Sequence, residues 1–458
     1  MGAPHVALFP FPDHGHVTPM LQLALHLASR GAYVTFINAE LGHQQLPSFT
    51  EYLNQTANLK YAHLSVGISA LEGPLTLDVV VSDSSGLGNV ESSSLPVLHR
   101  SLESQSSALE KLLTDLNGAQ NWPSFSCLIS DAFMPWTASV AQKLQVSWMV
   151  FWTPSATRFY LSTKALGHKE MNTELQKLAN ITIGLSPEST DVFDLSRLRN
   201  PHRRQLLMAR VEGTKMADVI LLNTFDALEE EAVKELAKDF PIRSLGPLCF
   251  GTGLKASKAN EESLSWLDRQ APHSILYISF GSKAMLQGRP LEQLAFGIES
   301  SNMPFLWVLR SGGEGLPEGF VERTEARSKI MKWVPQKQVL EHRAIGAFFT
   351  HCGWNSVLEA VVEGVPMICW PTFGDQPTNK LVIEQKWRIG RGIQGGEVDA
   401  ENIRQVIQDV VGNAEFRQRG SLLSRSAKSA LGQGGTSDQN FKFLMQELAV
   451  REHHVASC

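Results

Sequence analysis

The chain has 458 residues, of which 43% are hydrophobic and 19% charged, and its formal net charge at pH 7 is −5. This length predicts two to four domains with cores of their own, and the composition excludes collagen-like, fibrous and disordered classes. Neither half of the chain carries the positive excess that binds a phosphate backbone, so we expect no nucleic acid partner.

The sequence shows no sign of a membrane segment or a secretion signal. No window reaches the roughly 18 consecutive apolar residues of a membrane helix, and no basic segment precedes the short apolar run near the N-terminus. The five cysteines are odd in number, widely spaced and free of any Cys-x-x-Cys pair, as is typical of reduced thiols. We therefore predict a cytoplasmic protein without stable membrane insertion.

In the first half of the chain, short apolar runs alternate with amphipathic runs, which predicts strands that alternate with helices. An apolar run at His5–Phe11 is followed by a loop, an amphipathic run at Met20–Ser29 and a β-rich segment at Tyr33–Ile37. The alternation returns over Cys127–Ile129, Trp136–Leu144 and Ser147–Trp152. Residues 67–95 are rich in Gly, Ser and Pro, and we expect long loops there. Residues 1–245 are thus predicted to form an α/β domain with a parallel sheet.

The apolar periodicity stops over residues 246–262, where turn formers and charged residues predict a linker. A second series of strands and helices follows, so we expect a second α/β domain over residues 263–435. Its expected strands are Ile275–Phe280, Leu306–Leu309, Ala347–Thr350 and Val365–Trp370, and its clearest helical runs are Leu291–Glu299 and Ser356–Glu363. A final helix and tail are predicted over residues 436–458.

Two glycine-rich matches and one thiol are weak functional signals. Gly390–Gly395 matches G-x-G-x-x-G and Gly251–Ala256 matches its variant, but neither joins a strand directly to a helix, which dinucleotide binding requires. Cys352 follows His351, but adjacent residues rarely face each other, so we expect a packed thiol. No Asp-x-Asp pair is present to hold a metal-bound diphosphate.

The strongest chemical signal begins where the strand ending at Thr350 meets a helix that starts near Asn355. Backbone N–H groups and the helix dipole converge there with His351, Asn355 and Ser356, which makes an anion cradle. Glu359 lies on the same helix face, where it could accept hydrogen bonds from a ribose diol. As plain structural residues, His351 would be a core histidine, Asn355 a helix cap and Glu359 a solvated carboxylate.

Further residues flank this cradle. Trp333 offers a flat ring on which a base can stack, and Asp375 with Gln376 supplies hydrogen-bonding groups for sugar hydroxyls. Taken alone, Trp333 could equally belong to a core.

Together these residues resemble the signature of the plant secondary-product glycosyltransferases, the family 1 enzymes that use UDP-sugars. The resemblance runs without a gap from Trp333 to Gln376, through W-x-P-Q, V-L-x-H, G-x-F-x-T-H-C-G-W-N-S, E-x-x-x-x-G-V-P-M and D-Q. Pro10–Pro19, Phe280–Ser282 and Gly434–Ser437 are similar to other motifs of that family. The resemblance implies the GT-B fold: two Rossmann-like domains face each other across a cleft, and the C-terminal helix returns to the N-terminal domain.

The resemblance also implies a donor site for UDP-glucose, held mainly by the second domain. Glutamine at the last signature position is associated with glucose in that family, and an intact Trp354 disfavours glucuronate. Val334 is counted among the donor-binding residues. The other implied contacts are Trp333 with uracil, Gln336 and Glu359 with the ribose, Ser282, His351, Asn355 and Ser356 with the diphosphate, and Trp354, Asp375 and Gln376 with the sugar.

For catalysis, His16 matches the family's base and Asp131 its carboxylate partner. A neutral His16 would take the proton of an acceptor hydroxyl as the oxygen attacks the anomeric carbon, while Asp131 orients the ring. Direct attack inverts the anomeric centre, so the expected product is a β-glucoside. We expect His16 in the loop after the first strand. The plain alternatives are a helix-start histidine and a strand-end cap.

The acceptor is expected to be small, hydrophobic and phenolic, such as a flavonoid. The segments near Phe133–Trp136 and Phe151–Trp152 and the 67–95 loops are expected to line its pocket, and their aromatic content suits a flat phenolic compound. The same aromatic residues could equally be core. The resemblance implies a monomer that needs no metal or cofactor. Open alternatives are a non-catalytic nucleotide-sugar-binding protein, a terpenoid or hormone acceptor, another UDP-sugar, and transfer to C, N or S. The candidate acceptor residues are His14, Phe133, Met134, Trp136 and Trp152.

Overall fold

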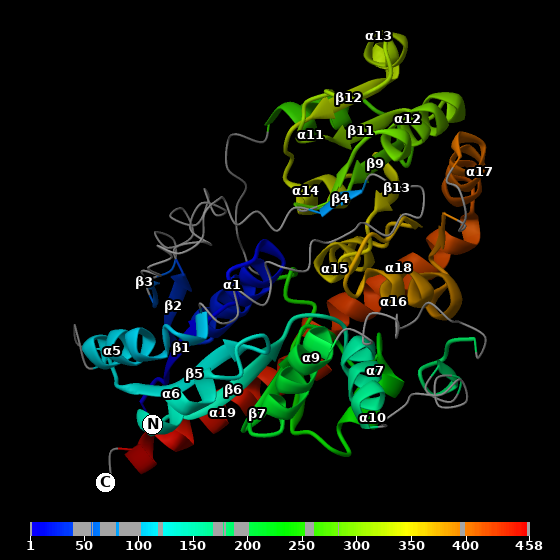
Figure 1. Ribbon diagram of the computed structural model, residues 1–458. Coiled ribbons are helices and arrows are strands. Elements are labelled where there is room, and N and C mark those ends of the chain that lie inside the picture. Colours follow the sequence, from blue (N-terminus) through cyan, green and yellow to red (C-terminus); the bar gives the residue numbers. More distant parts are fainter. Residues whose placement is uncertain are drawn as a thin grey trace.

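The structure, a computed structural model, describes residues 2–39, 56, 58–64, 79–81, 102–117, 122–167, 177, 180–186, 201–251, 261–282, 284–393 and 399–455. Two large parallel sheets organise this part of the chain, one built from residues 5–244 and the other from residues 275–392 (Figure 1). Helices cover both sheets, so the predicted α/β fold with two Rossmann-like units is confirmed.

The first sheet has the strand order β3-β2-β1-β5-β6-β7-β8. The chain order reverses between the neighbours β1 and β5, and such a switch point places the loops after both strands in one crevice. The strands are β1 His5–Phe9, β2 Tyr33–Ala39, β3 Leu59–Leu64, β5 Phe125–Asp131, β6 Ser147–Trp152, β7 Val219–Leu222 and β8 Ile242–Ser244. The helices are α1 His14–Ser29, α5 Ser106–Leu116, α6 Thr137–Lys143, α7 Ala156–Gly167, α9 Pro201–Thr214 and α10 Glu230–Leu236.

The second sheet has the order β12-β11-β9-β13-β14-β15, and its switch point lies between β9 and β13. The strands are β9 Ile275–Ser279, β11 Phe305–Val308, β12 Ser328–Met331, β13 Ile345–Thr350, β14 Met367–Cys369 and β15 Gly390–Gly392. The helices are α11 Glu261–Asp268, α12 Arg289–Ser301, α13 Phe320–Thr324, a 3-10 turn Glu325–Arg327, α14 Gln336–Glu341, α15 Trp354–Glu363, α16 Gln376–Leu381, a π-helical stretch Val382–Trp387, α17 Ala400–Val411, α18 Ala414–Leu431 and α19 Thr436–Val455.

The first three residues of the first glycine-rich match, Gly390–Gly392, form a strand of the second sheet. Gly390 begins the edge strand β15, and a Cβ there would lie 2.2 Å from the carbonyl oxygen of Met367. The glycine is therefore needed for close strand packing. Of the other match, only Gly251 lies within the described residues.

A short strand occurs inside the region predicted as loop. β4, Val79–Val81, pairs in parallel with β10, Ala284–Leu286, which follows the turn after β9. The all-loop expectation for residues 67–95 is therefore wrong at these three residues, and the remainder of that range lies outside the described residues. The pairing brings a segment of the first half against the second half.

The start of the predicted linker is packed rather than free. Leu248 and Cys249 are buried, and the Leu248 amide donates to Oδ1 of Asn223, just after β7, at 3.0 Å. Residues 252–260 of the predicted linker lie outside the described residues, and α11 begins at Glu261. These contacts pack the first part of the predicted linker against the domain that contains the first sheet.

The C-terminal helix returns to the first sheet, as expected. The Ser437 hydroxyl donates to the Gly246 carbonyl at 2.6 Å, and the Asn440 side chain donates to the Ser244 carbonyl at 2.9 Å. Phe441, Leu444 and Leu448 are fully buried in one core with residues of α1 and β1. In Figure 1, α19 lies along the N-terminal half near β5 and β6.

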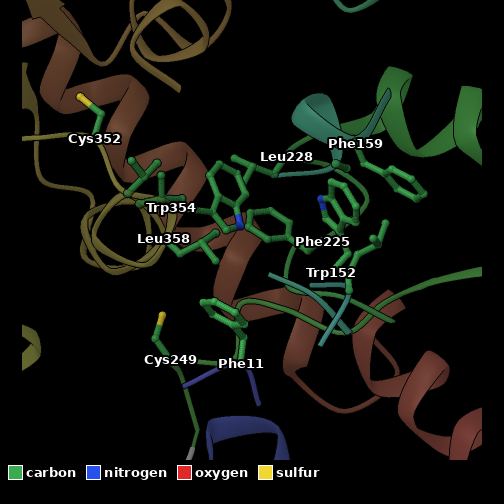
Figure 2. Packing of buried hydrophobic residues seen from close by; sticks show 14 of the residues in the cluster. Phe11, Trp152, Phe159, Phe225, Leu228, Cys249, Cys352, Trp354 and Leu358 are labelled. Carbon is green, nitrogen blue, oxygen red and sulfur yellow. The ribbon is translucent and has the colours of Figure 1, made fainter. Parts of the chain in front are cut away.

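One apolar cluster continues from one half of the molecule into the other. Figure 2 shows Trp354 and Leu358 of α15 beside Phe11 and Phe225 of the first half, and all of them are buried. The Trp354 indole N–H donates to the Asn223 carbonyl at 2.8 Å. The Trp354 side chain therefore joins the two halves.

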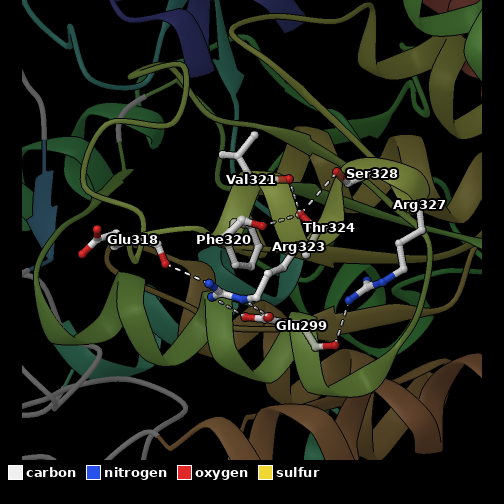
Figure 3. Close-up of polar contacts among 8 residues, drawn as sticks. All are labelled: Glu299, Glu318, Phe320, Val321, Arg323, Thr324, Arg327 and Ser328. Atoms are coloured by element: carbon white, nitrogen blue, oxygen red, sulfur yellow. Dashed lines mark hydrogen bonds and ion pairs between the residues drawn. The ribbon is translucent and has the colours of Figure 1, made fainter.

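In the second half, two arginines hold α13 and the 3-10 turn after it against the end of α12 (Figure 3). Arg323 donates to both carboxylate oxygens of Glu299, from Nε at 2.5 Å and from Nη2 at 3.1 Å, and this pairing lowers the pKa of Glu299. Arg327 donates to the carbonyls of Glu299 and Met303 at 2.9 Å each. These bonds attach α13 and the 3-10 turn after it to the end of α12 and to the residue that precedes β11 by two positions.

Acid is expected to weaken the fold at His26. Arg30 Nη1 lies 3.2 Å from His26 Nδ1 and can only donate, so Nε2 must donate to the Leu248 carbonyl, also at 3.2 Å. Burial, with the charge of Arg30, lowers the pKa of His26 from 6.5 to about 4. Between these two pH values the unfolded chain binds more protons, so stability falls as the pH drops.

We therefore expect the urea midpoint to decrease between pH 7 and pH 5, and to decrease less in His26→Gln. Buried His5 and His351, whose pKa values are also lowered to about 4, remain in both proteins, so the difference isolates His26. An equal decrease in the two proteins would contradict this assignment.

Candidate active site

The candidate base lies in a helix, not in a loop. α1 begins at His14 because Asp13 caps it, accepting from the Gly15 amide at 2.9 Å. His16 is therefore in the first helical turn, and the loop expectation is wrong. The helix was expected only from Met20, because Gly15 and Pro19, both poor helix formers, obscure its start in the sequence.

His16 and Asp131 are in direct contact. His16 Nδ1 lies 2.8 Å from Asp131 Oδ2 and 3.0 Å from the Thr153 hydroxyl. The other oxygen of Asp131, Oδ1, accepts from the Phe133 amide at 2.9 Å. The Asp131 side chain is fully buried, whereas that of His16 is 15% exposed. With its Nδ1 proton directed at the carboxylate, the ring presents a basic Nε2.

This contact follows from the sheet topology. β1 and β5 are parallel neighbours, and Phe9 pairs with Ser130, the residue before Asp131. Their carboxyl ends therefore meet, and α1 starts directly above them. Thr153, which the sequence analysis missed, follows β6, the next strand in the sheet. Its position directly after a predicted strand is the signal that could have found it.

Two aromatic rings lie next to His16. The Phe133 ring centroid lies 4.5 Å from that of His16 in an edge-on arrangement, and Phe11 lies 5.3 Å away. The guanidinium of Arg210, on α9, sits 3.3 Å above the Phe133 ring. Burial lowers the pKa of Arg210 to about 9, although the nearby Asp131 charge opposes this shift. The sequence analysis did not identify Arg210.

The other acceptor candidates lie mainly in the core. Met134 is 0% exposed, and Trp152 is 2% exposed and stacks on Phe159 at 4.3 Å. Met134 and Trp152 therefore expose no surface that an acceptor could contact in this structure, and they are core residues, the alternative given for them above. Trp136 is partly buried against the same core. His14 Nδ1 lies 3.0 Å from the Thr18 hydroxyl, and burial lowers the pKa of His14.

Across the cleft, four polar side chains form a network at α14 and α15. Gln336 Nε2 donates to Glu359 Oε2 at 2.7 Å and to the Ser356 hydroxyl at 2.9 Å, and the Tyr277 hydroxyl donates to Gln336 Oε1 at 3.1 Å. Burial raises the pKa of Glu359, and the Gln336 bond partly offsets this. Tyr277 was not among the donor-binding residues expected from the sequence. The network holds the Glu359 carboxyl in a fixed orientation.

The expected base-binding residues lie at the edge of this network. Trp333 is 63% exposed, so its core alternative is wrong and its ring is free to stack. Val334 next to it is buried, and Ser282 is exposed in the turn after β9.

His351 is held tightly between two glycines. A Cβ on Gly281 would lie 2.7 Å from the His351 ring, and one on Gly353 would lie 2.5 Å from it. Burial lowers the pKa of His351 to about 4, so the ring is neutral near pH 7. Its Nδ1 is buried and has no hydrogen-bond partner among the described residues. Asn355, two residues into α15, donates from Nδ2 to the Gly15 carbonyl at 3.0 Å.

The last signature residues are oriented by neighbouring loops. Gln376 Oε1 accepts from the Thr372 amide and hydroxyl at 2.8 Å and from the Phe373 amide at 3.0 Å, so the remaining polar group of the side chain is the Nε2 donor. Asp375 accepts from Asn379 at 2.9 Å, and burial raises the pKa of Asp375. In this pair, Asp375 therefore offers a carboxylate acceptor and Gln376 an amide donor.

Residues 108–429 match a family model described as UDP-glucoronosyl and UDP-glucosyl transferase. The (R)-mandelonitrile beta-glucosyltransferase of Prunus dulcis is 32% identical, with 98% of this chain and 96% of the relative covered. The 7-deoxyloganetin glucosyltransferase of Catharanthus roseus is 32% identical over 93% and 90% of the two chains. UDP-glycosyltransferase 85A7 of Arabidopsis thaliana is 31% identical over 97% and 96%.

Solved structures show the same architecture. Phytolacca americana UGT2, complexed with UDP-2fluoro-glucose and pterostilbene, superimposes with a TM-score of 0.79 at 28% identity, covering 98% of this chain and 99% of that chain. Os79 from O. sativa, in complex with U2F and trichothecene, gives a TM-score of 0.81 at 25% identity, covering 97% and 100%.

Two parallel sheets with polar side chains at their facing edges, and this structural likeness, define a GT-B glycosyltransferase. The chain belongs to the UDP-glucoronosyl and UDP-glucosyl transferase family and is a UDP-glycosyltransferase of the plant type. No helix within the described ranges is long and apolar enough to cross a membrane. In the same ranges, no three His, Cys, Asp or Glu side chains gather in a group that could hold a metal ion.

Proposed function

We propose that this enzyme transfers glucose from UDP-glucose to a hydroxyl of a small hydrophobic acceptor, with inversion, to give a β-glucoside. The observation that carries the proposal is the buried Asp131 carboxylate 2.8 Å from His16, at a cleft whose other side carries the Gln336–Glu359 network. Acceptor binding is assigned to residues 1–245 and donor binding to residues 263–435.

The chemistry requires one proton transfer and one substitution. His16 Nε2 takes the proton from the acceptor hydroxyl while the oxygen forms a bond to the anomeric carbon. The bond from that carbon to the β-phosphate oxygen breaks at the same time, and its electron pair leaves with UDP. Asp131 stabilises the imidazolium that forms, because its carboxylate is already bonded to Nδ1.

The donor is proposed to lie along α14 and α15. Trp333 stacks on the uracil ring, and Glu359, oriented by Gln336, accepts from the ribose hydroxyls. The amides at the start of α15, with the neutral His351, hold the diphosphate without a cluster of cations. The glucose hydroxyls reach Asp375 and the Nε2 of Gln376.

The donor is tested by comparing turnover of UDP-glucose, UDP-galactose and UDP-glucuronate at equal concentration. A site built to hydrogen-bond particular hydroxyls discriminates strongly, so we expect UDP-glucose to be preferred at least about tenfold. Equal or faster turnover of either rival donor would reject glucose as the transferred sugar. UDP binding with no transfer to any acceptor would instead indicate a nucleotide-sugar-binding protein.

The acceptor is proposed to be phenolic, because the partly buried Phe133 ring lies next to the His16 ring and could pack against a flat aromatic acceptor. The named relatives act on mandelonitrile and 7-deoxyloganetin, and one solved relative binds pterostilbene. A product-mass screen with flavonoids, pterostilbene, mandelonitrile and 7-deoxyloganetin therefore decides the class. Products from the last two compounds alone would reject the phenolic proposal.

We also propose that transfer needs no metal or cofactor, since neutral donors at α15 supply the diphosphate contacts. Transfer that is lost in EDTA and restored by Mg²⁺ would contradict this. A monomer is proposed as the active form, and size-exclusion chromatography with light scattering measures it. The four described cysteines are buried free thiols, which suits the reducing cytoplasm, and a fluorescent fusion tests that location.

A further inference from the structure

The helix that carries His16 has a proline inside it, at position 19. In an α-helix the carbonyl of residue i accepts from the amide of residue i+4. Pro19 has no N–H, so the Gly15 carbonyl receives no such bond, and the proline ring pushes that carbonyl away from the helix axis. Gly15 directly precedes His16, so this opened carbonyl belongs to the peptide unit that carries the candidate base.

The side chain of Asn355 occupies the opened position. Its Nδ2 donates to the Gly15 carbonyl at 3.0 Å, although the two residues lie 340 positions apart. Asn355 is the second residue of α15, at the end proposed to hold the diphosphate. One hydrogen bond therefore connects the first turn of α1 to the donor-binding helix.

We propose that Pro19 is a positioning residue whose function is to leave the Gly15 carbonyl open for Asn355, and that this bond sets His16 relative to the donor. The Asn355 amide has two N–H donors, so one reaches Gly15 while the second remains for a phosphate oxygen. Donor binding and the position of His16 are thus coupled through one side chain. This inference rests on the proposed role of His16 as the base.

Other contacts hold the two halves together elsewhere. The Trp354 indole N–H donates to the carbonyl of Asn223, which follows β7. The hydroxyl of Ser155, which precedes α7, donates to the Asn379 side chain at 3.3 Å. Loss of the Asn355 bond therefore shifts α1 without separating the halves. A small shift suffices, because proton transfer depends on hydrogen-bond distance between base and hydroxyl.

The test is Pro19→Ala, which returns an N–H to position 19 that competes with Asn355 for the Gly15 carbonyl. We expect kcat to fall about tenfold through misplacement of the base, while the Kd for UDP stays within about twofold. Because alanine is a far better helix former than proline, Tm is expected to be unchanged or higher. A more stable but slower enzyme is the distinctive result.

A double-variant cycle separates positioning from a general effect on the helix. With Asn355→Ala already present, the Gly15 carbonyl has lost its partner, so adding Pro19→Ala is expected to change kcat by less than about twofold. Pro290→Ala, at the start of α12 and away from the cleft, is the matched proline control and should retain wild-type kcat.

Wild-type kcat in Pro19→Ala would overturn the inference. A double variant whose kcat is a further tenfold below that of Asn355→Ala would also overturn it. A lower Tm with loss of UDP binding in Pro19→Ala would also overturn it, because the proline would then serve the fold. Wild-type turnover in His16→Ala is a separate result that rejects the proposed base itself. A dead His16→Ala with an unaffected Pro19→Ala rejects only the positioning role.

Discussion

His16→Ala is expected to lower kcat by about a thousandfold while UDP binds with nearly wild-type affinity. The substitution removes the group that accepts the hydroxyl proton but leaves the Gln336–Glu359 network across the cleft unchanged. The measurement is steady-state transfer from UDP-glucose, paired with calorimetric titration of UDP. The separation of kcat from UDP affinity is the essential result.

The chain offers a matched control for this variant. His342 also pairs with an aspartate, Asp268, at 3.1 Å, and its side chain is 14% exposed, close to the 15% of His16. It lies after α14, where no role in proton transfer is proposed. His342→Ala should therefore retain wild-type kcat, whereas wild-type kcat in His16→Ala would remove His16 as the base.

Asp131→Asn is expected to lower kcat by about a hundredfold or more by fixing the wrong tautomer of His16. The Phe133 amide donates to Oδ1 of Asp131, so the oxygen of an asparagine would take that place. Its NH2 group would then face His16 Nδ1, which would have to accept. The ring proton would move to Nε2, and a protonated Nε2 cannot take the proton of the acceptor.

Asp268→Asn, the same change in the His342 pair, is the control and should leave kcat unchanged. The Asp131→Asn protein must also keep its Kd for UDP, since Asp131 lies on the other side of the cleft. Activity within about threefold of wild type would show that the carboxylate does not set the tautomer. Loss of UDP binding would show instead that Asp131 serves the fold.

The sequence was sufficient for the fold class and for the strand that leads to the donor site. Apolar runs at His5–Phe11 and Ala347–Thr350 correspond to β1 and β13, because buried parallel strands are continuously apolar. The helix after Thr350 begins at Trp354, one residue from the expected start. His16 and Asp131, 115 positions apart, were paired only through resemblance to a family, and the β1–β5 neighbourhood supplies the physical reason.

Contacts between distant segments could not be predicted. Nothing local in the sequence shows that the Trp354 indole reaches the Asn223 carbonyl, or that Arg210 lies over Phe133. The type of a residue also did not predict whether its side chain lies in the core or at the cleft. Phe133 and Met134 are adjacent apolar residues, yet Phe133 contacts His16 whereas Met134 is fully buried. Burial of each side chain depends on how α6 and α9 pack, which one sequence does not contain.

The most direct test of the central claim is the configuration of the product. UDP-glucose carries its sugar in the α configuration, and a single direct attack promoted by His16 must invert it. Proton NMR of the purified glucoside, through the coupling of its anomeric hydrogen, reports the configuration. We expect a β-glucoside formed in equal amount to UDP. An α-glucoside, or free glucose in place of a glucoside, would contradict it.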